Sequence, residues 1–452
     1  MSLSLISIFL SLGLLMFLAY KGNSIIWVAP FCAAFVALLG GMNVLETYIS
    51  FGSDSNTGLY AGSYMRGAAE FFVQWFPAFF LGAVYTKVMD MTGSARSLAN
   101  TLIKLIGSKR AVVAVVLPCL LMTYGGVSLF VAVFVVYPMG YAIYRAANLP
   151  RTLLPGAIAF SAFGITMTTV PGTPQVQNLI PMNFYGTTPM AAPALSIIGM
   201  FLIGIPGYIY LEWEALKARK AGRGFIDDPK FEESGANENP SQWHWLAGLL
   251  PIITVIVTLN VFKMHIVISL LCGILLCCFL NLKQWKILVP AITAGANGSL
   301  TAIMNTSCAV GYGSVVRLAP GFATLSGMMM NMPGNILLSE SVAVNVLAGA
   351  TGTASGGMSI ALSALAPQYL EKARVLANGI AGREDYINQL LHRIASLSSG
   401  GLHTLPHNGA VLTLLAVSHC THKEAYKGIF VTTCLIPAIM SLILALVWGF
   451  TF

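Results

Sequence analysis

Long runs of apolar residues recur along this chain and predict membrane-spanning helices. A run of about 20 apolar residues is long enough to cross the hydrocarbon core of a bilayer as a helix. Such runs lie near 3–20, 24–42, 70–90, 111–144, 152–170, 190–211, 246–262, 264–281, 287–304, 341–366 and 428–452. Shorter or interrupted runs lie near 97–107, 321–332, 388–398 and 408–419. The pattern predicts an all-α polytopic membrane protein with about 11–14 membrane elements, the first a retained helix rather than a cleaved signal peptide.

One long hydrophilic stretch interrupts this pattern near the middle of the chain. It covers residues 212–245 and divides the sequence into a first membrane half, 1–211, and a second, 246–452. Its KARKAGR cluster (217–223) favours a cytoplasmic location, because cytoplasmic loops carry an excess of Lys and Arg.

The two halves share short motifs in the same order. Gly82-Ala83-Val84 matches Gly313-Ser314-Val315, and Gly125-Gly126-Val127-Ser128 matches Gly356-Gly357-Met358-Ser359, both at an offset of 231. With four further residues inserted, Val170-Pro171-Gly172-Thr173 matches Leu405-Pro406-His407-Asn408. We interpret this as a duplication into two inverted repeats with re-entrant hairpins and broken helices, and such transporters hold their substrate between the repeats.

Each half also carries polar, Gly/Pro-broken sequence inside a membrane segment. The first half has 121–128 and 166–178, and the second has 349–359 and 396–410. Irregular backbone at this depth is tolerated only where it is buried in protein or lines a watery cavity. Helix N-termini there present free N–H groups and a partial positive charge, which suit a carboxylate. The glycine-rich stretches are equally compatible with close helix packing.

These broken segments supply the candidate substrate-binding residues. They are Gly125, Gly126, Thr169, Pro171, Gly172, Thr173, Gln175, Asn178, Ser355, Gly356, Ser398, Ser399, Gly400, His403, Thr404, His407 and Asn408.

Ionisable or polar residues at membrane depth are candidates for coupling transport to an ion. They are Glu340, His403, His407, Asn305 and Ser307. For Glu340, helix-dipole compensation in a first helical turn is favoured over a coupling role, whereas Asn305 is equally explained by a helix cap. Arg317 fits either a bidentate carboxylate contact or a cytoplasmic anchor, and Lys87 with Asp90 fits a local ion pair.

Composition narrows the class of protein. The chain has 452 residues, 56% hydrophobic and only 9% charged, whereas soluble chains carry about 25% charged residues. A soluble enzyme or a nucleic-acid binder is therefore excluded. The net charge is +8, but residues 212–238 hold five basic and seven acidic residues, which leaves 19 basic and nine acidic residues elsewhere. No metal-ligand spacing, cofactor motif or catalytic motif is present, so we expect no metal, no cofactor and no enzymatic activity.

The stretch SGGLHTLPHNGAVLTLLAVSHCTHKEAYK (399–427) resembles the C-terminal region of the gluconate permease (GntP) family, with members for short hydroxy acids such as 3-hydroxybutyrate most similar. The resemblance implies an inverted-repeat secondary transporter of the ion transporter superfamily. It implies uptake of organic monoanions with protons, a homodimer and elevator-type movement. In this sequence, the polar hairpin tips that form the site in the family would correspond to Pro171 to Asn178 and Ser399 to Asn408.

The sequence therefore predicts a proton symporter for a small monocarboxylate, a hydroxy acid or a sugar acid, in the inner membrane of a bacterium. Tip N–H groups with Thr173, Asn178, Ser399, Thr404 and Asn408 are expected to hold the carboxylate, and His403 or His407 to be the ionisable contact. A sodium-coupled symporter of the same fold, with Na⁺ near Asn305 and Ser307, is one alternative. A cation/proton antiporter is another, although it normally needs more buried acids.

Overall fold

The computed structural model describes residues 3–21, 23–49, 63–228, 245–406 and 408–451, and helices are the only regular elements in those ranges. The prediction of an all-α polytopic membrane protein is confirmed. The α-helices are α1 Leu3–Tyr20, α2 Ile25–Leu39, α3 Val44–Ile49, α4 Tyr64–Met91, α5 Ser94–Ile106, α6 Ala111–Tyr124, α7 Leu129–Ala146, α8 Leu154–Ala159, α9 Val176–Tyr185, α10 Pro193–Lys220, α11 Leu246–Asn260, α12 Ile266–Leu280, α13 Trp285–Leu318, α14 Phe322–Met330, α15 Ile336–Thr351, α16 Ala354–Ala377, α17 Arg383–Ser399, α18 Gly409–Val417, α19 His422–Phe430 and α20 Ile436–Trp448. Two π-helical segments, η3 Phe160–Ile165 and η5 Val431–Leu435, follow α8 and α19, and short 3₁₀ turns lie at η1 Ser108–Arg110, η2 Arg151–Leu153 and η4 Leu282–Gln284.

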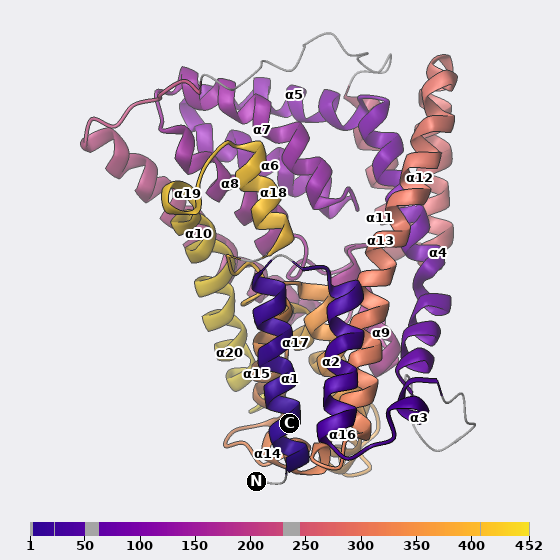
Figure 1. Cartoon of the computed structure of the whole chain (residues 1–452). Helices are drawn as coiled ribbons and strands as arrows, with labels where there is room; N and C mark the ends of the chain where they lie inside the picture. Colours follow the sequence, from indigo (N-terminus) through magenta and orange to yellow (C-terminus); the bar gives the residue numbers. More distant parts are fainter. Residues whose placement is uncertain (1–2, 22, 50–62, 229–244, 407, 452) are drawn as a thin grey trace.

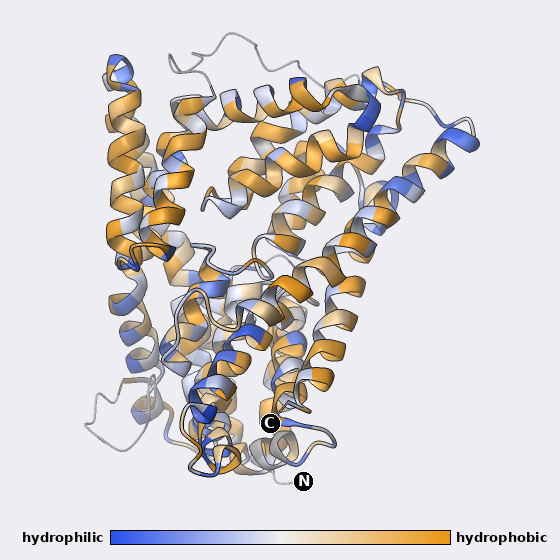
Figure 2. Ribbon diagram, turned by 180° about the vertical axis from the view of Figure 1, so that it is seen from behind, coloured by the Kyte–Doolittle hydropathy of each residue, from blue (hydrophilic) through white to orange (hydrophobic). Residues whose placement is uncertain are grey.

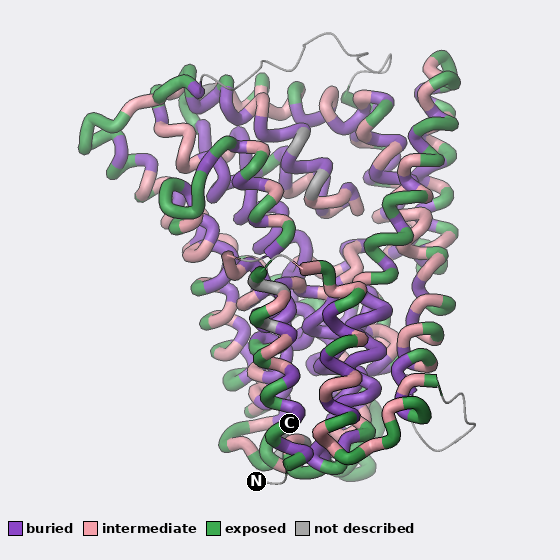
Figure 3. The backbone as a smooth tube through the Cα atoms, viewed as in Figure 1, coloured by how far each residue is buried: buried purple, intermediate pink, exposed green. Residues whose placement is uncertain are grey.

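Apolar side chains cover the outside of this helical assembly. Within the described residues, four helical stretches are long and apolar enough to cross a membrane, at Tyr64–Met91, Pro193–Lys220, Leu282–Leu318 and His422–Trp448. Figure 2 shows hydrophobic residues along most of the length of the outer helices, and Figure 3 shows exposed positions alternating with buried ones on them. An apolar surface of this extent is stable only in contact with lipid.

The order of elements recurs in the two halves. Each half has a long helix (α4, α13), a hairpin broken by glycine (α6–α7, α15–α16), a helix that ends inside the protein (α8 with η3, α17) and a short helix after the break (α9, α18). The division of the chain at 212–245 stays a prediction, because 229–244 lie outside the described residues, but α10 extends through Lys220 and makes the first part of that stretch helical.

The two long helices α4 and α13 run side by side over most of the height of the molecule (Figure 1). Glycines allow this close approach. A Cβ at Gly295 would lie 2.5 Å from the Val84 Cα, and a Cβ at Gly311 would lie 2.8 Å from the Tyr64 carbonyl oxygen. Gly295 faces Val84 and Gly311 faces Tyr64, so the numbering rises along α13 while it falls along α4, and the two helices are antiparallel.

Replacing Gly295 with alanine should therefore separate α4 from α13. Neither helix backbone can yield locally, so we expect a loss of about 1–3 kcal/mol of stability. Thermal unfolding of the purified protein measures it. Gly298→Ala is the matched control, because nothing lies within 4 Å of a Cβ at that position. Equal stability of the two variants would contradict the packing described.

The short helices that follow the breaks pack against the opposite half. Helix α9 of the first half packs against α16 and α17, and α18 of the second half packs against α7 and α8. Figure 1 shows α18 with α6, α7 and α8 in the upper part of the molecule, and α9 with α16 and α17 in the lower part. In each half, the broken segment therefore carries the chain from one of these two parts of the molecule to the other.

Candidate functional site

The candidate site lies where two broken segments meet, tip 1 (residues 166–178) and tip 2 (residues 396–410). Tip 1 follows the π-helix η3 and leads into α9, with Gly172 in the left-handed region at φ +73°. Tip 2 follows α17 and leads into α18, with Asn408 as the N-cap of that helix. The prolines 171, 174 and 406 lack an N–H and so prevent the helices from continuing.

The two tips are in direct contact. The Ser396 hydroxyl oxygen lies 3.1 Å from the carbonyl oxygens of both Thr168 and Gln177, so its one hydrogen is shared between the two ends of tip 1. Gly400 faces Thr168 so closely that a Cβ would lie 2.6 Å from the threonine hydroxyl oxygen. Segments separated by more than 200 residues in sequence thus form one buried polar region.

Two asparagines hold the tips in shape by the same bonds. The Asn178 amide donates to the carbonyl of Thr173, five residues earlier, at 2.9 Å, and to that of Pro189 at 3.0 Å. The Asn408 amide donates to the carbonyl of His403, again five residues earlier, at 2.9 Å, and to that of Gly352 at 2.7 Å. The equivalence of the tips therefore runs between 173–178 and 403–408, rather than between Pro171 and Pro406.

These bonds bear on the prediction that both asparagines hold the carboxylate. Both amide hydrogens of each residue are used internally, and the Asn408 oxygen accepts from the N–H of Val411 at 2.8 Å. In this structure neither amide is available to donate to a carboxylate. Asn178 and Asn408 position the tips.

Asn408→Ala should accordingly lower stability and not only uptake. The change removes a helix N-cap, worth about 1 kcal/mol, and leaves two buried carbonyls without that donor, at about 1–3 kcal/mol. Thermal unfolding of the detergent-purified protein measures the loss. Thr413→Ala in the same helix is the control, because the Thr413 hydroxyl bonds the Gly409 carbonyl at the surface. A fully stable Asn408→Ala protein that fails only in uptake would restore the direct binding role.

The candidate hydroxyls also donate within the protein. Their acceptors are the Ile165 carbonyl for Thr169, the Thr433 carbonyl for Thr404, the Ser341 hydroxyl for Ser398 and the Ser396 carbonyl for Ser399. The Thr173 hydroxyl accepts from the N–H of Gln175. A hydroxyl has one hydrogen to donate, so in this arrangement the four donating side chains offer an anion little, whereas the Thr173 hydroxyl keeps its hydrogen.

Backbone N–H groups of the tips are better donors. Those of Thr173, His403 and Thr404 lie in buried residues and donate no hydrogen bond to any group in the described part of the chain. Buried N–H groups without a partner are rare in proteins. Both tips therefore present donors to the interior.

The breaks in the two hairpins support the tips. In the first half, a Cβ at Gly126 would meet Pro174 at 3.0 Å, and the Gln175 amide donates to the Thr123 carbonyl at 2.6 Å. The neighbouring Gly125 packs against Ile252, and the carbonyl of Pro171 accepts from Tyr124.

In the second half the break lies at Gly352, with φ +62°, and Thr353 caps α16. Gly356 and its neighbour Ser355, expected at the break, lie instead in the first turn of that helix. The GG motifs of the two halves are therefore not structurally equivalent.

Arg393 is a central residue of the region that the sequence interpretation missed. It lies in α17 and is fully buried. Its Nε and Nη2 donate to the Ala191 carbonyl at 3.1 and 2.9 Å, Nη2 also to the Pro189 carbonyl at 3.2 Å, and Nη1 to the Asn178 amide oxygen at 2.9 Å. All these acceptors are neutral, and Arg393 makes no ion pair with any described residue. The signal that could have found it is an arginine inside the run LLHRIASL.

The neighbouring His392 is also buried and was likewise missed. Its Nδ1 lies 2.6 Å from the Thr187 hydroxyl and its Nε2 lies 3.3 Å from the Asn178 amide oxygen. Since an amide oxygen can only accept, Nε2 is the donor and Nδ1 accepts from threonine. Both nitrogens are thereby satisfied in the neutral ring, which fits a positioning role.

Of the two candidate histidines of tip 2, the structure describes only His403. His403 is buried, and neither of its ring nitrogens has a hydrogen-bond partner among the described residues. His407 lies outside the described residues.

Glu340, a coupling candidate, lies in α15 and is fully buried. The Tyr185 hydroxyl at the end of α9 donates to its Oε1, and its Oε2 has no partner within the ranges that the structure describes. Along α9, Tyr185 lies seven residues beyond Asn178, which is about 10 Å of helix. Glu340 is therefore linked to tip 1 through Tyr185 and α9, and the next residue of α15, Ser341, accepts a hydrogen bond from Ser398 of tip 2 at 2.8 Å.

The other coupling candidates lie within α13. Ser307 is buried and its hydroxyl has no partner in the described part of the chain, while Asn305 is half-buried. Lys87 and Asp90 form the expected ion pair, at 3.5 Å.

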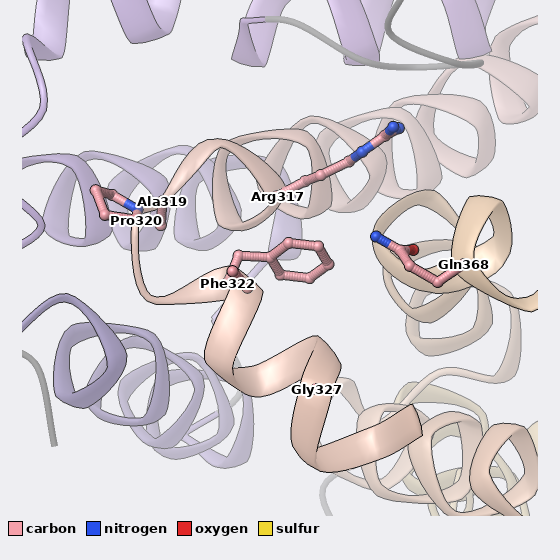
Figure 4. A pocket seen from close by; sticks show the side chains of 7 residues that line it. Arg317, Ala319, Pro320, Phe322, Gly327 and Gln368 are labelled. Carbon is pink, nitrogen blue, oxygen red and sulfur yellow. The ribbon is translucent and has the colours of Figure 1, made fainter. Parts of the chain in front are cut away.

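Arg317 borders a cavity of about 570 Å³ between the end of α13, α14 and α16 (Figure 4). Its lining also includes Phe322 and Gln368, and no described residue of either tip. A carboxylate contact at Arg317 would therefore lie outside the tip region.

Known proteins identify the family of this chain. Residues 14–294 match the CitMHS family, described as citrate transporter. A protein described as the uncharacterized transporter YxjC of Bacillus subtilis is 36% identical, over 98% of both chains.

Two solved structures share the fold. The YdaH transporter of Alcanivorax borkumensis superimposes with a TM-score of 0.61 at 14% identity, over 95% of this chain and 99% of that one. MtrF of Neisseria gonorrhoeae, described within a class of antimetabolite efflux pumps, gives 0.57 at 10% identity, over 95% and 96%.

These matches overturn the resemblance to the gluconate permease family, which was sharp in only one C-terminal stretch, 399–427. That stretch lies beyond the residues matched by the family, and it carries a helix break that other transporters need as well. The matches also describe a multi-pass membrane transporter rather than an enzyme. The chain belongs to the CitMHS citrate transporter family.

Proposed function

We propose that this transporter moves a small organic carboxylate by proton symport and binds it between tip 1 and tip 2. The observation that carries the proposal is Arg393, a fully buried cation held by neutral acceptors. A buried charge without a counter-ion is costly. A transported anion that visits the adjoining region would supply the missing negative charge.

The N–H groups of Thr173, His403 and Thr404, which have no partner among the described residues, support the same site. Oriented N–H groups in a water-poor environment bind carboxylate oxygens well. Because the hydroxyls of Thr169, Ser398, Ser399 and Thr404 already donate within the protein, we infer that these backbone groups make the direct contacts and that Arg393 supplies a positive electrostatic potential.

The family makes citrate the first substrate to consider, and hydroxy monocarboxylates such as 3-hydroxybutyrate or gluconate the alternative. One arginine balances one carboxylate. A tricarboxylate would need its remaining charge balanced by cations that travel with it, which favours symport over a uniport.

Glu340 is our candidate for the coupling proton. It is buried, makes no ion pair with any described residue, and has one carboxylate oxygen without a partner among them. Protonating it removes a buried negative charge that is linked through Tyr185 and α9 to Asn178, which Arg393 contacts, and losing that charge favours anion binding. A sodium-coupled mechanism at Ser307 is the second candidate, because the buried hydroxyl there has no partner in the described ranges. The small number of buried acids among the described residues argues against a cation/proton antiporter.

The transport cycle we propose is alternating access of the elevator type in a homodimer, in the cytoplasmic (inner) membrane of a bacterium. The contact of both tips across the halves supports a single site that can be exposed to either side. The cationic KARKAGR cluster supports a cytoplasmic end of α10.

The test is uptake into liposomes that contain the purified protein. Citrate, gluconate and 3-hydroxybutyrate are offered at two external pH values, with and without Na⁺. We expect one carboxylate to accumulate under an inward proton gradient and a protonophore to abolish this accumulation. Uptake that needs Na⁺ and ignores the pH gradient would select the sodium alternative, and no carboxylate uptake under any condition would overturn the proposal.

A further inference from the structure

A second cavity lies where the C-terminal end of α10 approaches α19. Its volume is about 440 Å³, and no described residue of tip 1 or tip 2 lines it. The lining comes from the end of α7, the η2 turn, α10 and α19. Figure 1 shows α10 and α19 beside each other on one side of the molecule, where α10 projects outward.

This cavity is basic. Lys217, Arg223, Lys423 and Lys427 line it together with Glu214 and Glu424. Both acids already accept hydrogen bonds from other residues. The Glu214 carboxylate accepts from the Lys427 ammonium at 2.9 Å. The Glu424 carboxylate accepts from the N–H and hydroxyl of Thr421, each at 2.7 Å, in a capping box. Lys217, Arg223 and Lys423 are left without a carboxylate partner among the described residues. Three exposed cations around one cavity attract an anionic group.

The cavity opens beside the apolar outer face of α10. Phe201, Ile205, Ile209, Trp213 and Leu216 are each about half exposed and recur every three or four residues, so they form one stripe along the helix. The Lys217 ammonium lies 4.9 Å from the centre of the Trp213 ring, at the end of this stripe. Trp with a neighbouring Lys is typical of the membrane–water interface.

We propose that this cavity binds the headgroup of an anionic phospholipid, with its acyl chains along the α10 stripe. The lipid is favoured over a soluble anion because the basic groups and the lipid-facing stripe are continuous on α10. Basic pockets between membrane helices at the cytoplasmic side bind anionic headgroups in this way. Because α19 leads through η5 towards tip 2, where Thr404 contacts Thr433, the lipid would brace an element that supports the substrate site.

The experiment is a thermal-shift titration of the detergent-purified full chain. The probes are short-chain phosphatidylglycerol, short-chain phosphatidylcholine and inorganic phosphate. For the wild type we expect stabilisation by phosphatidylglycerol alone. For Lys217→Gln/Arg223→Gln/Lys423→Gln we expect roughly 100-fold weaker binding of that lipid, from about 1 kcal/mol for each basic residue.

Lys104→Gln/Lys283→Gln/Lys286→Gln removes the same charge from exposed positions outside the cavity and should bind phosphatidylglycerol like the wild type. The proposal is overturned if the two triple variants bind equally, if phosphatidylcholine stabilises as well as phosphatidylglycerol, or if inorganic phosphate does. If the cavity variant does not fold in detergent, the three single variants replace it, each with about fivefold weaker binding expected.

Discussion

Replacing Arg393 with glutamine is expected to abolish carboxylate uptake. The change removes the buried cation beside the tips, and losing one partner of a buried charge pair costs about 2–5 kcal/mol, which is roughly 30-fold or more in affinity. We expect stabilisation of the purified protein by its carboxylate to disappear as well. Uptake per folded protein and the substrate-induced thermal shift measure both effects.

Loss of folding would also abolish uptake, so a second variant separates the two. Arg393→Lys keeps the charge but loses the forked bonds to the Ala191 and Pro189 carbonyls. It should be less stable than the wild type and yet respond to substrate. Arg374→Gln, at an exposed position of α16, is the control. A folded Arg393→Gln protein that binds and transports normally would remove the basis of the proposed site.

Replacing Glu340 with glutamine should uncouple transport from the proton gradient. Glutamine is close to glutamic acid in shape and accepts a bond from Tyr185, but it cannot exchange a proton. We expect gradient-driven accumulation to be lost, because a side chain that cannot bind or release a proton cannot carry the coupling proton. Exchange of labelled for unlabelled substrate, which needs no net proton movement, should continue.

The matched control is Glu70→Gln, because Glu70 is a partly exposed acid paired with Arg66 in α4. It should keep both activities. If Glu340→Gln still accumulates substrate in response to a pH gradient, the coupling proton is carried elsewhere, and His403 is the next residue to test.

Sequence patterns predicted the class of fold, and they located the two broken segments that the structure brings into contact and that we propose as the site. Apolar runs and Gly/Pro breaks are local features, and each has a local consequence: a helix, or an end to one. Pro171 and Pro406 remove backbone donors wherever the chain places them. The breaks at 166–178 and 396–410 can therefore be located from the amino-acid sequence alone.

The chemistry within the site depends on contacts between distant segments, which local patterns do not contain. Asparagine is a residue type that often binds a substrate, but the amides of Asn178 and Asn408 donate to the carbonyls of Pro189 and Gly352. Conversely, Arg393 resembles a simple interruption of an apolar run. Its importance follows from its burial beside tip 1, over 200 residues away in sequence.

The family assignment failed for a related reason. A helix break rich in Gly, Pro, His and Asn meets a physical need that unrelated transporters share, so a resemblance confined to 399–427 reflects that need. The match over 14–294 spans nearly all of the first half and the start of the second, and it reports common descent instead.

The most direct test of the central claim is a cryo-electron microscopy map of the protein in a lipid nanodisc with its carboxylate bound. We predict density for the anion between tip 1 and tip 2, in contact with the N–H groups of Thr173, His403 and Thr404 and on the side of Arg393. Anion density elsewhere, such as the cavity at Arg317, with both tips unoccupied, would contradict the account.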